Sequence, residues 1–207
     1  MDNKKNDVAL VINGEFPSNE KIIDQIRNSN TIIAVDGASN SLIDIGVIPT
    51  ITIGDFDSIK NSNKDRISKK IYTEDQNKTD LEKSLDWCIE NDYKSLSVFG
   101  IAGKSEDHFL GNFFVMNDYY GKIDYKIITD FSIITPSSGQ KTFKSYKGQI
   151  ISLISFESDN VISSTNLKYP LRSYSLSCSV RAIRNESIES NFSVQSSKKL
   201  MVFQIKD

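Results

Sequence analysis

The sequence has one histidine, His108, and two cysteines, Cys88 and Cys178, among its 207 residues. A structural zinc site needs about four Cys or His ligands, so this kind of site is excluded. The cysteines do not form a CxxC motif, and the sequence alone leaves a disulfide between them possible. We expect instead two free thiols in a reducing cytoplasm, and therefore a cytoplasmic protein.

An excess of basic residues and a long apolar run are also missing. Lys and Arg number 25 against 27 Asp and Glu, and the formal net charge is −2, which argues against nucleic acid as a partner. The first residues, MDNKKNDVALVI, carry charges and only a short apolar stretch, which argues against a signal peptide and a membrane span. An anionic substrate would therefore need a local source of positive charge, such as a metal ion or a few placed Lys and Arg side chains.

Hydrophobic periodicity divides the chain into two parts. From residue 8 to about 128, short β-rich runs alternate with segments of helical spacing, which predicts a Rossmann-like α/β domain with a mostly parallel sheet. Ser18 is a possible N-cap of the first helix. The predicted strands are 8–12, 31–35, 51–53, 96–99 and 125–128, and the predicted helices are 19–28, 38–45, 81–91 and 107–120.

After residue 130 the helical spacing is lost. Short apolar runs separated by Ser, Asn, Lys and Gly indicate an antiparallel β-sandwich or barrel. These runs are 150–156, 161–164, 176–180, 192–194 and 200–205. The hydrophobic pattern changes near TPSSGQ, at 135–140, so we expect domains at 1–135 and 136–207.

Acidic residues gather where predicted strands end. Asp36 follows the strand at 31–35, and Asp55 and Asp57 follow the strand at 51–53. In sheets of this type, ligands bind outside the carboxyl ends of the strands. Two more carboxylates are expected near this edge: Asp107, which follows Gly100 and Gly103 after the strand at 96–99, and Asp80, at the start of the helix at 81–91. Such a cluster suits a hard divalent cation such as Mg²⁺, which would offset the repulsion and attract a nucleotide.

Each of these residues also has a simpler structural interpretation. Asp36 before Gly37 can form a turn, and Asp55 and Asp57 can form Asx-turns. Asp80, together with Thr79, and Asp107 can cap helices, and Asp80 and Lys83 have the i, i+3 spacing of a surface ion pair. His108 alone is more typical of a packed or hydrogen-bonding histidine than of a metal ligand.

Several segments, taken together, resemble the thiamin pyrophosphokinase family. They are VDGASN at 35–40, Pro49, IGDFDS at 53–58, DQNKTDLEKSL at 75–85, GIAGKSEDHFLGN at 100–112, GQIISLI at 148–154 and LKYPL at 167–171. The resemblance implies that ATP and thiamin are converted to AMP and thiamin diphosphate with Mg²⁺. It implies an α/β catalytic domain that binds ATP and Mg²⁺, a β-sandwich domain that binds thiamin, and a homodimer with thiamin between subunits.

The resemblance also assigns roles to residues. Asp55, Asp57 and Asp80 would bind Mg²⁺ and the phosphates, and these three and Asp107 are the expected catalytic residues. The expected substrate-binding residues are Asp36, Gln76, Lys78, Lys83, Lys104, His108 and Asn185.

The chain departs from the family pattern in two places. The glycine-rich block usually reads GxxGGRxDH, and here Lys104 replaces the second Gly and Ser105 replaces the Arg. Lys104 can restore the positive charge but not the bidentate geometry of Arg. Arg184 replaces a Ser before Asn185, and a cation facing cationic thiamin would be unfavourable.

Three other functions fit parts of the sequence. DFDSI approaches the DxDx[TV] motif of HAD-like phosphatases, in which the first Asp is a nucleophile, but Ile59 occupies the Thr/Val position. A DxD glycosyltransferase would be longer. A degenerate module that binds thiamin or nucleotide without turnover is the non-enzymatic alternative.

Overall fold

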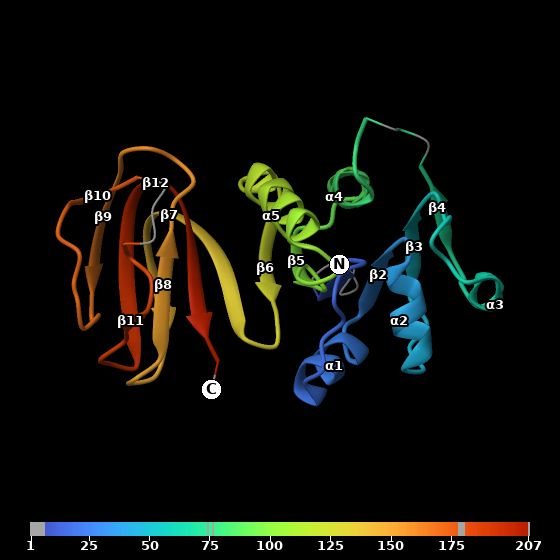
Figure 1. The fold of residues 1–207 in the computed structure, drawn as a ribbon, viewed down its shortest axis with the longest axis horizontal. Helices are drawn as coiled ribbons and strands as arrows, with labels where there is room; N and C mark the ends of the chain where they lie inside the picture. The colour runs from blue at the N-terminus through green and yellow to red at the C-terminus, as the bar shows by residue number, and fades with distance from the viewer. Residues whose placement is uncertain (1–6, 74, 76, 178–180, 207) are drawn as a thin grey trace. The chain divides into compact units, whose positions relative to one another are not determined.

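The computed structural model describes residues 7–73, 75, 77–177 and 181–206. It divides the chain into two compact units, Met1–Asp130 and Phe131–Asp207 (Figure 1). This division precedes the expected domain boundary after residue 135, because TPSSGQ is part of a strand, β7 (Ser132–Lys144), and is not a linker. None of the helices among the described residues is both long and apolar enough to span a membrane.

The first unit contains a parallel sheet of six strands with the order β6-β5-β1-β2-β3-β4. Every residue of β1 and β2 is buried, as expected for strands covered on both faces of a sheet. The strands are β1 (Val8–Val11), β2 (Thr31–Val35), β3 (Ile51–Gly54), β4 (Lys70–Tyr72), β5 (Ser95–Phe99) and β6 (Asp124–Ile128).

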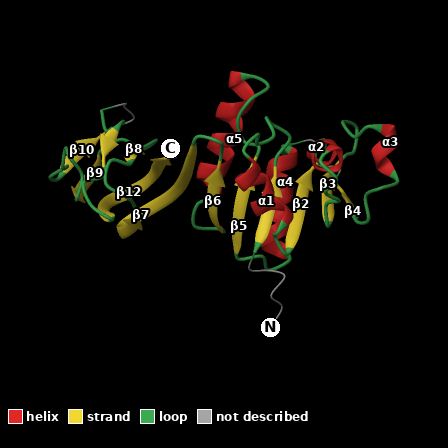
Figure 2. Ribbon diagram, turned by 90° about the horizontal axis from the view of Figure 1, so that it is seen from below, coloured by secondary structure: helices red, strands yellow, loops and turns green. Residues whose placement is uncertain are grey.

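Helices cover both faces of this sheet, so the predicted α/β fold is confirmed. In Figure 1, α1 (Glu20–Arg27) and α2 (Ala38–Asp44) lie on one face, and α4 (Asp80–Glu90) and α5 (Glu106–Tyr119) lie on the other. Figure 2 shows the helices in red around the yellow strands, including the short α3 (Asn61–Lys64). The core beneath α1 and α2 consists of Ala9, Val11, Ile22, Ile26, Ile32, Ala34, Ala38, Leu42, Phe99 and Ile128.

Two details of the first unit differ from the sequence predictions. Asn19, not Ser18, caps α1, and its side chain accepts from the Lys21 backbone N–H. Ser18 instead donates its backbone N–H and its hydroxyl to Asp130 Oδ2, both at 2.8 Å. The short α3 and the exposed edge strand β4 were not predicted, because neither contains enough apolar residues to show a period.

The second unit is built from antiparallel strands, as predicted. The strands are β7, β8 (Ile150–Ile154), β9 (Asn160–Thr165), β10 (Tyr174–Leu176), β11 (Asn185–Glu186) and β12 (Asn191–Ile205). The runs at 192–194 and 200–205 belong to one long strand, β12, whose register shifts between Ser196 and Leu200. Because of this shift, β12 pairs with β9 before the irregularity and with β8 after it. Apolar side chains of these strands and their connections, including Ile151, Leu176 and Phe192, form the core.

Candidate active site

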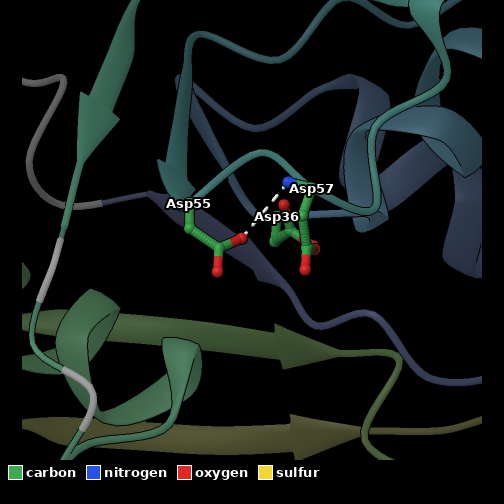
Figure 3. A group of neighbouring side chains, drawn as sticks. All are labelled: Asp36, Asp55 and Asp57. Carbon is green, nitrogen blue, oxygen red and sulfur yellow. Dashed lines mark hydrogen bonds between the residues drawn. The ribbon is translucent and has the colours of Figure 1, made fainter.

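Three carboxylates meet at the carboxyl ends of two neighbouring parallel strands. Asp36 follows β2, and Asp55 and Asp57 follow β3; one carboxylate oxygen of each lies within 4.8 Å of the others (Figure 3). The Asp36 backbone N–H donates to the Ile53 carbonyl at 2.8 Å, which joins the residue after β2 to β3. We call Asp36, Asp55 and Asp57 the acidic cluster.

Gly54 allows the two loops to approach closely. Its φ of 152° lies in a region that favours glycine, and a Cβ at this position would stand 2.8 Å from the Asp36 Cβ. A side chain at residue 54 would therefore push the loop after β3 away from Asp36.

The turn that carries Asp55 and Asp57 is held by local hydrogen bonds and by an apolar anchor. The Asp57 backbone N–H donates to Asp55 Oδ1 at 3.2 Å. Asp55 therefore forms the expected Asx-turn and is also a member of the acidic cluster. The Ser58 hydroxyl donates to Asp57 Oδ1 at 2.8 Å. Phe56 has a φ of 67°, which is rare for a bulky residue, and its ring packs against the core formed by Ile43, Ile59 and Ile67. This packing holds the backbone in a conformation that presents both carboxylates.

Asp36 is the buried member of the acidic cluster, with 4% of its surface exposed. Its Oδ1 atom is buried and has no hydrogen-bond partner among the described residues. Burial raises the pKa of Asp36 above its ordinary value, and the charges of Asp80 and Asp57 raise it further. Buried polar atoms normally have partners, so this orphaned oxygen is available to a bound ligand. Three carboxylates that converge in this way fit a hard divalent cation.

Asp80 lies outside the acidic cluster but close enough to influence it. It is the first residue of α4, and its Oδ1 accepts from Lys83 Nζ at 3.2 Å. The expected i, i+3 ion pair is therefore present, but the Lys83 side chain is only 7% exposed, so the pair is not a surface pair. A buried ammonium beside Asp80 offsets part of the negative charge at this end of the sheet.

A capping box sets the start of α4 and with it the position of Asp80. The Glu82 backbone N–H donates to Thr79 Oγ1, and the Thr79 backbone N–H donates to Glu82 Oε2 at 2.8 Å. We expect Thr79→Ala to lower the free energy of unfolding by about 1 kcal/mol, measured by urea denaturation, because one helix N–H loses its partner. Thr79→Ser keeps the hydroxyl and is the control. Equal stability of Thr79→Ala and the wild type would contradict this role of the cap.

Other predicted site residues have partners elsewhere. Lys78 Nζ donates to Asp86 Oδ2 at 2.7 Å, and this hydrogen bond raises the pKa of Lys78. Asp107 lies in the first turn of α5, where hydrogen bonds from the Ser105 side chain and the His108 backbone lower its pKa, as expected for a carboxylate near a helix start. The structure brings neither Lys78 nor Asp107 into the acidic cluster. Gln76 lies outside the described residues.

The first part of the glycine-rich block, residues 100–105, forms the loop between β5 and α5. Lys104 Nζ donates to Asn13 Oδ1 at 2.6 Å. An open pocket of about 280 Å³ lies beside this loop and is lined by Ala102, Gly103, Lys104, Ser105, Glu106 and Phe109. Asn13 was not predicted as a site residue. Its position directly after the first strand was the available signal. This signal indicates a site residue only once β1 is known to lie between β5 and β2.

Asn185 belongs to the second unit and is 7% exposed. Its Oδ1 accepts from the Tyr169 backbone N–H at 3.0 Å, and its Nδ2 donates to the Tyr169 carbonyl at 2.7 Å. Asn185 therefore holds the backbone of the LKYPL segment, while the Tyr169 side chain is 66% exposed. Arg184 has a φ of 56°, and its backbone N–H donates to Ser152 Oγ.

An α/β unit with carboxylates at the carboxyl ends of its parallel strands is typical of enzymes that bind ligands at that edge of the sheet. Residues 23–128 match the family described as "Thiamin pyrophosphokinase, catalytic domain", and residues 132–203 match "Thiamin pyrophosphokinase, substrate-binding domain". The chain belongs to the thiamin pyrophosphokinase family.

Individual relatives agree with this assignment. The chain is 32% identical to the thiamine pyrophosphokinase of Bacillus subtilis (strain 168) over 182 residues, which cover 82% of this chain and 84% of the relative. It is similar to the crystal structure of thiamine pyrophosphokinase from Bacillus subtilis with a TM-score of 0.83 and 27% identity, covering 97% of this chain and 99% of that one. The fold is also that of thiamin pyrophosphokinase from Candida albicans, with a TM-score of 0.81 and 20% identity, covering 99% and 90%.

Proposed function

We propose that this protein transfers the pyrophosphoryl group of ATP to the hydroxyl of thiamin, giving thiamin diphosphate and AMP, and that Mg²⁺ is its metal ion. The observation that carries the proposal is the acidic cluster, with its orphaned Asp36 oxygen, in a chain of this family. The thiamin oxygen forms a bond to the β-phosphorus, the bond from that phosphorus to the α-phosphate oxygen breaks, and the hydroxyl proton is released.

The residues of the acidic cluster would hold Mg²⁺ together with the phosphates. When bound, Mg²⁺ would neutralise charge on the phosphates and polarise the phosphorus under attack. Asp80 is held by Lys83 beside the cluster, where its carboxylate can accept the hydroxyl proton of thiamin. Lys83 is then well placed to offset the charge of this carboxylate while ATP is bound.

We propose that the second unit contributes the thiamin site and an interface in a homodimer. Asn185 orders the LKYPL segment by accepting from the Tyr169 backbone N–H. Large exposed apolar side chains belong to Tyr169 itself and to Ile183 and Ile188, which flank Asn185 in the sequence. Such side chains favour burial against a partner molecule.

One assay tests the reaction. The purified protein is incubated with ATP, Mg²⁺ and thiamin, and we expect AMP and thiamin diphosphate in equal amounts. Formation of ADP or free phosphate instead would indicate a different phosphoryl transfer. Absence of turnover, with nucleotide still bound, would favour the non-enzymatic binding module.

A further inference from the structure

The Lys104 ammonium group is bound by a neutral partner. Its only hydrogen bond within the described residues is to the Asn13 carboxamide oxygen at 2.6 Å, and no carboxylate there lies within 4.0 Å of it. An ammonium has three N–H donors, so two remain for another acceptor. The full positive charge of Lys104 is therefore available to an anion.

Residues on both sides of Asn13 are bonded to the end of β5 and to the loop that follows it. The Ile12 backbone N–H donates to the Phe99 carbonyl at 2.8 Å, and the Glu15 backbone N–H donates to the Ala102 carbonyl at 2.5 Å. A Cβ at Gly14 would collide with the carbonyl oxygens of this loop, so the two backbones can pack this closely only because residue 14 is a glycine.

The Asn13 carboxamide also reaches the loop that carries Asp36. A Cβ added at Gly37 would stand 2.5 Å from Asn13 Nδ2, so the amide lies directly against the residue after Asp36. Strands β5, β1 and β2 are neighbours, and Asn13 connects the loops that follow all three. The Lys104 ammonium is thereby placed one carboxamide away from the loop of the acidic cluster.

The backbone of Lys104 is strained. Its φ of 65° lies in the left-handed region, which costs free energy for every residue except glycine. The side chain is exposed, so core packing does not explain why a lysine occupies this position. Strain of this kind is concentrated at functional sites.

We propose that Asn13 is a positioning residue that holds the Lys104 ammonium against the polyphosphate of the nucleotide. This inference rests on the proposed function, because it assigns the phosphate-binding cation of that same site. Lys104 would contact the phosphate oxygens, and Asn13 acts only through Lys104.

The test measures the Kd of Mg·ATP by calorimetry in the absence of thiamin. Lys104→Gly relieves the strain, so we expect an unchanged or higher unfolding temperature together with a Kd raised about tenfold to hundredfold. Asn13→Ala should raise the Kd about threefold to tenfold. In the double variant, Asn13→Ala should have no further effect on the Kd, because its action requires Lys104. Lys104→Arg should restore much of the binding.

Asp159→Gly is the matched control. Asp159 is exposed, has a φ of 56° and lies between β8 and β9, so its replacement relieves the same backbone strain without changing the Kd of Mg·ATP. An unchanged Kd in Lys104→Gly, or independent effects of the two substitutions, would overturn the inference. The proposed function fails separately, if the wild type binds Mg·ATP but forms no AMP with thiamin.

Discussion

Asp57→Asn should lower the rate of Mg²⁺-dependent AMP formation by about 10²–10³-fold while the protein stays folded. Asp57 is the exposed member of the acidic cluster, and its charge is needed to hold a divalent cation. Asn keeps a side-chain oxygen that can accept the Ser58 hydroxyl, now at 2.8 Å from Asp57 Oδ1, so the turn should persist. The measurement is the initial rate of AMP release as a function of Mg²⁺ concentration, together with the thermal unfolding midpoint in metal-free buffer.

Asp65→Asn is the control for this substitution. Asp65 is exposed and lies a few residues further along the same segment, after α3, so it loses the same charge away from the cluster. We expect it to retain the activity of the wild type. Full activity in Asp57→Asn would mean that the metal is held elsewhere.

Asp36→Asn should have opposite effects on activity and stability. We expect AMP formation to fall by about 10²–10³-fold, because Asp36 loses its negative charge, and with it an anionic ligand oxygen that has no hydrogen-bond partner in the described part of the chain. We expect the metal-free protein to become more stable by about 0.5–2 kcal/mol at pH 7, because a buried charge facing two other carboxylates is removed. Asn also tolerates the φ of 43° at this position.

The difference in stability between the wild type and Asp36→Asn should depend on pH. Burial is the main cause that raises the pKa of Asp36 in the folded protein above its ordinary value of 3.8. The metal-free wild type therefore loses stability as pH rises from about 3.8 through the raised pKa, and Asp36→Asn does not show this loss. The stability difference should vanish at low pH and be largest at neutral pH.

Added Mg²⁺ separates this electrostatic effect from a change in packing. At 100 times its Kd, a bound ion stabilises the wild type by about 2.7 kcal/mol, and a variant that does not bind gains nothing. In Mg²⁺ the wild type should then be more stable than Asp36→Asn, whereas without metal the variant should be the more stable one. Thermal unfolding in EDTA and in Mg²⁺ between pH 4 and pH 8 provides the comparison. A less stable Asp36→Asn in EDTA at neutral pH would contradict this account.

Local sequence determined the α/β unit and most of its functional edge. Alternating apolar runs predicted β1, β2, β3, β5 and β6, because a buried parallel strand requires nearly continuous apolar residues. The positions of Asp36, Asp55 and Asp57 directly after two of these strands were enough to expect a shared acidic site, since parallel strands end at the same edge of the sheet.

Contacts between distant segments were decided only by tertiary structure. The order of the strands places Asn13 beside Lys104, 91 residues further along the chain, and no local pattern encodes this pairing. Packing buries Lys83, which helical spacing alone assigned to the surface. Likewise, β7 and β12 are long strands because they pair with each other on both sides of the irregularity between Ser196 and Leu200, although TPSSGQ and SSKK contain the residues of loops. The sequence by itself therefore determined which residues end the strands, and the tertiary structure decided which of them meet, because strand order depends on packing among all the elements.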